Sequence, residues 1–308
     1  MNTEELFDVI IIGGGAAGLT AGIYSSRARL STLILNEGAI GGQMVLTDEI
    51  ANYPGVERTN GYLLANTMKK QAKEYGCKIK SNLKISRYDL EGDIKHITLE
   101  DGREFQSRTV ILAPGGRPRP LAIPGEEQFK GSGISYCATC DGEFFTGKEV
   151  IVVGGGNSAL EEAVALTTHA KKVTIVHQFD HFQAFRHAVE QALANEKIEF
   201  VMESELRSFN GNGVLQEVSM EHLPTGKIST RNIDGVFIFA GYIPNTSDLK
   251  GIVKLNERHE ILVDAEMKTS LPGVFAAGDC IQKKYRQVTT AVSDGTIASL
   301  SAAEYLRS

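Results

Sequence analysis

Two closely spaced cysteines and the residue after them are the side chains best suited to chemistry. Cys137 and Cys140 are separated by two residues and Asp141 follows, while the other two cysteines stand alone. This spacing brings two sulfurs close enough to form a disulfide and lets one thiol act as a nucleophile. A zinc site would need two further ligands, and structural disulfides are rare in reducing compartments, so the pair favours redox chemistry without a metal. Asp141 is a candidate acid or base for the thiols, although its Asp-Gly dipeptide is also common in turns.

A glycine-rich turn near the N-terminus has the spacing of a nucleotide-binding site. Gly13, Gly15 and Gly18 follow a β-branched strand pattern and open a helical pattern. In such a turn the first glycine makes the bend, the second lets the backbone approach a pyrophosphate, and the third allows close packing of helix on strand. Glu37 lies nineteen residues beyond Gly18, where an acid can hold a ribose hydroxyl. The context therefore favours a dinucleotide site over an ordinary glycine turn.

An acidic residue near the C-terminus indicates which dinucleotide is bound. Asp279 ends the strand-like segment 274–279, and a helix is expected after it. An acid in this place can bond the ribityl chain of a flavin, while the following helix directs its N-terminus at the ring. The alternative is an ordinary aspartate that caps a helix. Together with the first glycine turn, the segment favours FAD.

The order strand, glycine turn, helix, strand occurs twice in the chain. A second glycine turn at 154–156 follows another β-branched run, so the sequence contains an internal repeat of a nucleotide-type fold. The strands predicted for the two copies are 8–12, 32–35, 149–153 and 173–176, and the helices are 19–27 and 160–168.

Two similar segments, 109–116 and 235–241, mark the places where the chain passes between domains. We therefore predict an α/β fold of two Rossmann-like (three-layer ββα) nucleotide-binding domains, the second inserted into the first. Residues 1–117 and 246–308 are expected to form the FAD-binding domain. Residues 118–245 are expected to form an inserted NAD(P)-binding-like domain that carries the cysteine pair.

The composition limits the classes of partner. Of 308 residues, 42% are hydrophobic and 23% are charged, and the net charge is −6. Nucleic acid would need a basic face, so no nucleic-acid partner is expected. No run of about 20 apolar residues is present, so no membrane span is expected. The acidic N-terminus leads straight into a strand, which argues against a secretory signal and for the cytoplasm.

The chain resembles the low-molecular-weight thioredoxin reductases along nearly its whole length. The resemblance implies a homodimeric enzyme in which electrons pass from FAD to the Cys137–Cys140 disulfide and then to thioredoxin. It also implies that Cys137 attacks thioredoxin, that Cys140 faces the flavin, and that Asp141 is the acid near the thiols. The stretches that carry the resemblance are 41–43, 52–55, 137–142, 154–159, 276–279 and 285–287.

Cofactor-binding residues are expected in both terminal segments. By resemblance, Gln43 and Asn52 lie near the flavin, and Asp279 and Gln287 contact the cofactor. The predicted set is Gly13, Gly15, Ala16, Ala17, Gly18, Asn36, Glu37, Gly42, Gln43, Asn52, Gly115, Asp279, Arg286, Gln287 and Val288.

One part of the chain departs from the NADPH-using members of that family, which hold the 2′-phosphate with several arginines. The matching positions here are Gln178, Phe179 and Gln183. A hydrogen bond to a charged group is worth about 1.5–3 kcal/mol, so losing two or three would weaken NADPH binding about a hundredfold or more. Arg186 is the only nearby replacement, and the return strand lacks the acid that NADH would favour.

This departure resembles the pattern of relatives that take electrons from reduced ferredoxin. We therefore favour ferredoxin as the donor, with NADPH as the alternative and a non-catalytic flavin redox sensor as a third hypothesis. The aromatic run Phe179, Phe182 and Phe185 has two interpretations: it packs over a vacant nucleotide pocket, or it is a helix face on the core.

Overall fold

The computed structural model describes residues 5–46, 50 and 52–307, and the chain divides into two compact units. Residues 1–117 and 243–308 form what we call the terminal unit, and residues 118–242 form the inserted unit. The two crossings of the chain pair with each other as strands β7 and β16. The boundary predicted at 245/246 lies three residues beyond the one between these units.

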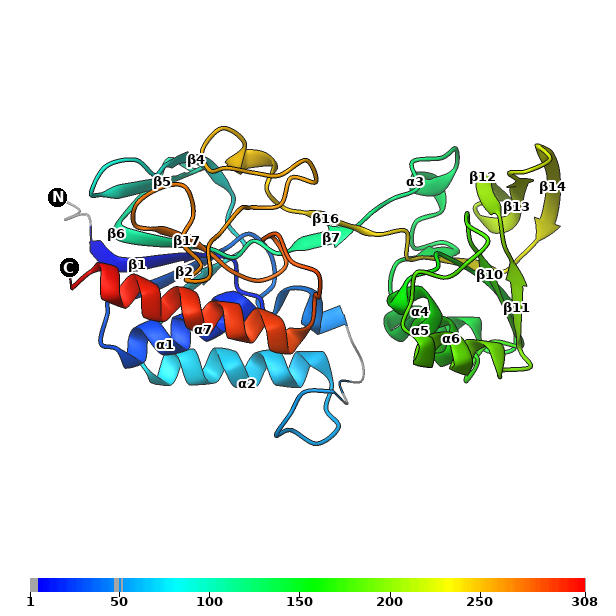
Figure 1. Cartoon of the computed structure of the whole chain (residues 1–308), viewed down its shortest axis with the longest axis horizontal. Coiled ribbons are helices and arrows are strands. Elements are labelled where there is room, and N and C mark those ends of the chain that lie inside the picture. Colours follow the sequence, from blue (N-terminus) through cyan, green and yellow to red (C-terminus); the bar gives the residue numbers. More distant parts are fainter. Residues whose placement is uncertain (1–4, 47–49, 51, 308) are drawn as a thin grey trace. The chain divides into compact units, whose positions relative to one another are not determined.

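The terminal unit is built on a seven-stranded sheet in the order β3-β2-β1-β6-β5-β4, with β17 also paired to β6. Strands β1, β2, β3, β6 and β17 run parallel. Side chains alternate across β1, so that Val9 and Ile11 enter one core cluster while Ile10 and Ile12 enter another. Since both faces are covered, the strand is apolar on both sides. Helices α1, α2 and α7 lie together on one face (Figure 1).

The strands of this unit are β1 (Leu6–Ile12), β2 (Thr32–Asn36), β3 (Lys78–Ser81), β4 (Ile85–Asp89), β5 (Lys95–Leu99), β6 (Glu104–Leu112) and β17 (Val274–Ala276). Its helices are α1 (Ala16–Arg27), α2 (Gly61–Glu74) and α7 (Val288–Tyr305), with 3₁₀ turns η1 (Gly42–Leu46) and η3 (Ser247–Leu249). The crossing strands are β7 (Gly116–Pro118) and β16 (Tyr242–Pro244).

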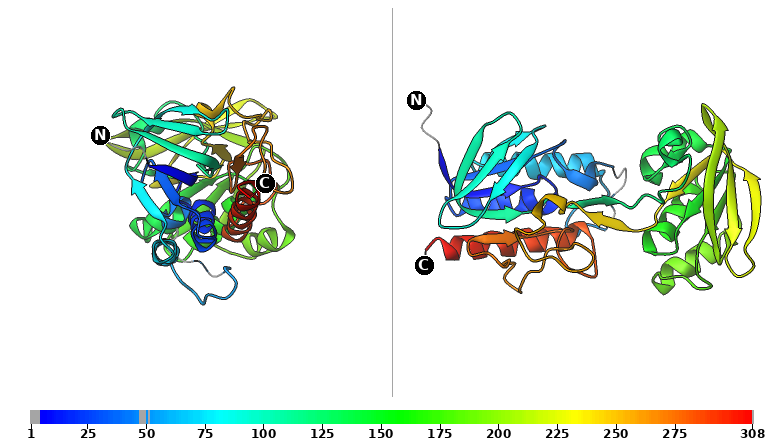
Figure 2. Two further views of the ribbon diagram at one scale, coloured as in Figure 1. Left: turned by 90° about the vertical axis from the view of Figure 1, so that its left-hand side faces the viewer. Right: turned by 90° about the horizontal axis from the view of Figure 1, so that it is seen from above.

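The inserted unit repeats the layered plan around a parallel sheet in the order β11-β10-β9-β15-β8. Along β9, Val150 and Val152 face the core under the helices, and Ile151 and Val153 face the core under an antiparallel sheet, β12-β13-β14. Figure 2 shows this antiparallel sheet on the side of the unit away from its helices. Both units are layered α/β folds built on parallel strands, which confirms the predicted fold class.

The strands of this unit are β8 (Ile134–Ser135), β9 (Glu149–Val153), β10 (Lys172–Val176), β11 (Ile198–Val201), β12 (Ser204–Asn212), β13 (Val214–His222), β14 (Lys227–Asn232) and β15 (Gly235–Ile238). Its helices are α3 (Glu126–Phe129), α4 (Ala138–Asp141), α5 (Asn157–Leu166) and α6 (Arg186–Leu193), with the 3₁₀ turn η2 (Gly142–Phe145). Among the described residues, no helix is long and apolar enough to cross a membrane.

A close helix crossing organises the terminal unit. A Cβ added to Gly295 of α7 would lie 2.2 Å from the carbonyl oxygen of Ala17 in α1, so only glycine allows this approach. Further along the same helices, the hydroxyls of Ser25 and Ser299 share a buried 2.8 Å hydrogen bond. The crossing brings the first turn of α1 next to the C-terminal helix, although the two segments are distant in sequence.

Candidate active site and cofactor site

The first glycine turn forms a cradle that larger residues would fill. Gly13 has φ +102°, and a Cβ there would lie 2.1 Å from the carbonyl oxygen of Ala113. A Cβ on Gly18 would lie 1.9 Å from the carbonyl oxygen of Gly13. Gly15 caps α1 without a side-chain hydrogen bond, and the first helical turn contains no acid, so its N–H groups can receive an anion such as a pyrophosphate.

The end of β2 is tied to this turn. Asn36 Oδ1 accepts the N–H of Gly14 at 2.8 Å, which explains its place in the predicted set. The neighbouring Glu37 is exposed, and its Oε1 accepts the N–H of Ile85 at 3.3 Å. Its predicted contact with a ribose hydroxyl stays a prediction. Ala16 and Ala17 are buried at the start of α1.

Asp279 supplies an independent indication of a bound group. Its Oδ1 is buried and has no hydrogen-bond partner among the described residues. Burial raises the pKa of its carboxyl, against the opposing charges of Lys283 and Arg286. An orphaned buried acceptor is what a ribityl hydroxyl would satisfy, so the site fits FAD. Arg286 is itself paired with Glu260, a contact that the sequence did not indicate.

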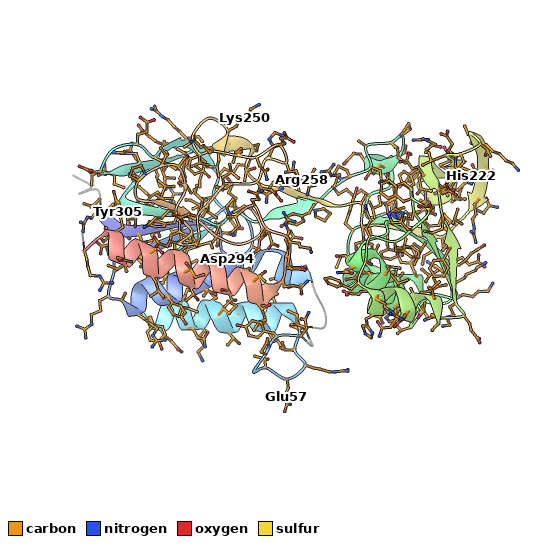
Figure 3. The ribbon with its side chains drawn as sticks, in the orientation of Figure 1. Glu57, His222, Lys250, Arg258, Asp294 and Tyr305 are labelled. Carbon is orange, nitrogen blue, oxygen red and sulfur yellow. The ribbon has the colours of Figure 1, made fainter. Side chains whose placement is uncertain are left out.

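Three of the predicted cofactor residues, Asn52, Gln287 and Val288, lie at the start of α7. Asn52 donates from Nδ2 to Oε1 of Gln287 at 3.3 Å, across 235 positions of sequence. Gln287 caps α7 in a reciprocal arrangement with Thr290, and Val288 begins the helix. Figure 3 locates Asp294 further along the same helix, where it pairs with Lys283.

Two further predicted residues belong to tight backbone segments. A Cβ on Gly42 would lie 3.2 Å from the Cα of Gly15, so the start of η1, with the exposed Gln43, borders the glycine turn. The carbonyl of Gly115 accepts the N–H of Asn245 at 3.0 Å. The structure thus gathers most of the predicted set in one unit, while the cofactor role of each residue stays a prediction.

The predicted dithiol lies in the inserted unit, where α4 follows β8. Cys137 is disulfide-bonded; the side chain of Cys140 lies outside the described residues, so the predicted pairing stays a prediction. Ser135 Oγ lies 2.6 Å from Oδ2 of Asp141 and accepts the N–H of Cys137 at 3.0 Å. The sequence analysis missed Ser135, because only the fold shows that its hydroxyl reaches the acid.

The other cysteines are unsuited to act as nucleophiles. Cys77 and Cys280 are free and buried in the terminal unit. Burial raises the pKa of the Cys77 thiol to about 11 and that of the Cys280 thiol to about 12. Both therefore stay protonated at neutral pH, and a thiol is a poor nucleophile.

The second glycine turn lies beneath a histidine. A Cβ added to Gly155 would lie 2.4 Å from the ring of His177, which follows β10. Burial lowers the pKa of His177, and its Nε2 has no partner among the described side chains. The N–H of Gln183 donates to the carbonyl of Gly155 at 2.8 Å, so position 183 is held beside the turn.

Arg186 and the aromatic run lie in different environments near this turn. Arg186, the proposed replacement, pairs with Glu190 at 2.7 Å on exposed α6. Of the aromatic run, Phe182 stacks on His177 at 5.9 Å and packs on the core. Phe179 meets the His177 ring edge-on at 5.3 Å, whereas Phe185 is 55% exposed. The run is thus neither a uniform cover nor a uniform core face.

Comparisons with known proteins agree with this geometry. Residues 7–295 match the family model described as pyridine nucleotide-disulphide oxidoreductase. A thioredoxin reductase of Peptoclostridium acidaminophilum is 42% identical over 98% of each chain. The crystal structure of Lactococcus lactis thioredoxin reductase matches with a TM-score of 0.92 and 39% identity, over 98% of this chain and 99% of that one.

A ferredoxin-flavin thioredoxin reductase from Clostridium acetobutylicum is also similar, with 28% identity, a TM-score of 0.53 and 98% of each chain covered. The expectation that the chain is closest to the ferredoxin-linked branch is therefore not supported, since relatives named simply thioredoxin reductase are more similar. The chain belongs to the thioredoxin reductases, FAD-binding members of the pyridine nucleotide-disulphide oxidoreductase family.

Proposed function

We propose that this enzyme reduces the disulfide of a thioredoxin through the Cys137–Cys140 pair. The observation that carries the proposal is a disulfide-bonded Cys137 whose backbone shares the buried hydroxyl of Ser135 with the carboxylate of Asp141. Phe144 lies three residues beyond Asp141 and is 73% exposed, which offers an apolar contact to a protein partner. By resemblance, we also propose a homodimer.

The thiol chemistry balances as two successive exchanges. FAD, when bound, supplies the two-electron couple between the donor and the protein disulfide. Reduction of the Cys137–Cys140 disulfide consumes two electrons and two protons. The Cys137 thiol then gives its proton to Asp141 and attacks a sulfur of thioredoxin, whose disulfide breaks; Asp141 returns the proton to the leaving sulfur. Cys140 then attacks the Cys137 sulfur of the mixed disulfide, and its thiol proton passes to the departing thioredoxin sulfur, which restores the protein disulfide and releases thioredoxin as a dithiol.

We propose a reduced pyridine nucleotide, NADPH in the first place, as the electron donor. Membership of a pyridine nucleotide family supports this choice over ferredoxin. Gly156 is the N-cap of α5, which has no side-chain cap hydrogen bond and no acid in its first turn, so the start of this helix can receive a pyrophosphate. Because the arginine positions hold Gln178, Phe179 and Gln183, discrimination for the 2′-phosphate should be weak.

Reduced ferredoxin is the second candidate. The observation in its favour is the same scarcity of cations: the arginine positions hold Gln178, Phe179 and Gln183, and burial lowers the pKa of His177, which disfavours its charged form. If ferredoxin is the donor, no 2′-phosphate has to be bound in this region, and the loss of the arginines would not weaken the binding of the donor.

Anaerobic bleaching of the flavin band tests the donor. The purified holoenzyme is mixed separately with NADPH, NADH and reduced ferredoxin. Rapid bleaching by a pyridine nucleotide supports the proposal, whereas bleaching by ferredoxin alone contradicts it. A Cys137→Ser variant should still bleach but should no longer reduce thioredoxin; retained reduction of thioredoxin would contradict the dithiol mechanism.

A further inference from the structure

We propose that Ser135 is a positioning residue that holds Asp141 in both protonation states of thiol–disulfide exchange. The inference rests on the proposed function, because it assigns Asp141 a proton that comes and goes. It concerns a single hydroxyl in the inserted unit, at the point where β8 gives way to the segment that carries Cys137.

The backbone that carries this hydroxyl belongs to the sheet and not to the cysteine loop. Ser135 is only 6% exposed and ends β8, where it is opposite Phe237 of the parallel strand β15. Phe237 is fully buried and packs edge-on against Phe145 at 5.1 Å. Anchored in this way, Ser135 gives the acid a fixed reference that a flexible loop residue would not provide.

Three polar atoms surround the Ser135 oxygen. It accepts the N–H of Cys137 at 3.0 Å, lies 2.6 Å from Oδ2 of Asp141 and lies 3.1 Å from the carbonyl oxygen of Cys137. A hydroxyl carries one proton, so it can donate to only one of the two oxygens at a time. The shorter contact, to the carboxylate, takes that proton when Asp141 is ionised.

The second oxygen gives the hydroxyl an alternative when Asp141 is protonated. The carboxylic acid then donates to Ser135 Oγ, and the hydroxyl proton rotates towards the carbonyl of Cys137. The Cys137 N–H continues to donate to the same oxygen in both arrangements. No heavy atom has to move, so Asp141 keeps its place while a proton passes to and from the thiols. An alanine at this position would remove the hydroxyl from the acid in both protonation states.

The test isolates the thiol step from the electron donor. Holoenzyme reduced with dithionite is mixed with oxidised thioredoxin, and the rate of thioredoxin reduction is measured for Ser135→Ala, Asp141→Asn and the double variant. We expect Ser135→Ala to lower the maximal rate about 10- to 100-fold, the factor for one hydrogen bond to a charged group. The concentration of thioredoxin at half-maximal rate should stay within about twofold, since the hydroxyl is buried and does not touch the partner.

The double variant decides whether Ser135 acts through Asp141. If it does, the rate of the double variant equals that of Asp141→Asn alone, because the hydroxyl has nothing left to position. Ser135→Thr, which keeps the hydroxyl, should restore most of the rate lost in Ser135→Ala. Ser204→Ala is the matched control: Ser204 is also buried in the inserted unit, at 4% exposure, and bonds a backbone carbonyl two residues away at 2.8 Å.

Several results would overturn the inference. An unchanged rate of thioredoxin reduction in Ser135→Ala would overturn it. So would a double variant whose rate is lowered by the product of the two single-variant factors, because the two residues would then act independently. An Asp141→Asn variant of undiminished rate would refute the positioning role while leaving dithiol chemistry intact. Failure of the proposed function would give a different result, because the Cys137→Ser variant would then still reduce thioredoxin.

Discussion

Restoring positive charge beside the second glycine turn is the most direct test of how the donor is recognised. The changes are Gln178→Arg and Gln183→Arg, alone and together. The backbone of Gln183 bonds Gly155 at 2.8 Å and forms a β-bridge with Gly156, so an arginine there starts beside the turn. Gln178 directly follows His177, and both glutamines are exposed, so neither guanidinium would be buried.

The expected gain in NADPH affinity is the free energy of one hydrogen bond to a charged group minus the entropic cost of ordering a long side chain. Such a bond is worth about 1.5–3 kcal/mol, and fixing an arginine costs up to about 2 kcal/mol. We therefore expect each arginine to lower the NADPH concentration for half-maximal flavin bleaching about 3- to 10-fold, and both together about 10- to 100-fold. The value for NADH, which has no 2′-phosphate, should change less than about twofold.

The assay is stopped-flow bleaching of the anaerobic holoenzyme over a series of NADPH and NADH concentrations. Gln191→Arg, on the exposed side of α6, adds the same charge away from the turn and serves as the control. Equal changes for NADPH and NADH, or the same change in the control variant, would contradict recognition of the 2′-phosphate, because they would reflect a general attraction of anions.

Three further predictions address the cofactor, the partner and pH. Gly18→Ala should lose FAD, because its Cβ would lie 1.9 Å from the Gly13 carbonyl, whereas Gly38→Ala, with no atom within 4 Å, should retain it; the flavin-to-protein absorbance ratio measures both. Phe144→Ala should raise the KM for thioredoxin about tenfold or more, by loss of an exposed apolar contact, and leave flavin bleaching unchanged; an unaltered KM would exclude this side chain from docking. Burial lowers the pKa of His177, so the unfolded state binds a proton at this side chain more readily than the folded state does. The stability of the protein should therefore fall as the pH drops through about 6.5, and the loss in Tm between pH 8 and 5 should be smaller in His177→Phe.

Local sequence patterns predicted the parts of the fold that depend on neighbours in the chain. The apolar runs of β1 and β9 and the glycines after them were sufficient to place both nucleotide-type repeats. The two helices begin earlier than predicted, at Ala16 and Asn157, because the first turn of each consists of small or polar residues, including Gly18 in α1, that hide the helical pattern. Helix starts of this kind are set by the strand beneath them and not by propensity.

The site residues that sequence reasoning missed depend on contacts between distant segments. The hydrogen bond from Ser135 to Asp141 forms only because α4 folds back against the end of β8. Nothing in the amino-acid sequence of this segment indicates that the hydroxyl reaches the carboxylate. The ion pair between Arg286 and Glu260 likewise joins the segment just before α7 to a separate loop. The preference for ferredoxin came from three substituted positions alone, and such a local loss carries less information than similarity over the whole chain.

The close crossing of α1 and α7 has a consequence for how the protein is made. Ala17 is translated long before Gly295, the glycine against which it fits. The terminal unit therefore cannot complete its core, or its cradle for FAD, until β17 and α7 have been translated. The inserted unit is complete long before and can fold first. Truncation after residue 273 should accordingly leave a folded inserted unit attached to an N-terminal half that cannot hold flavin.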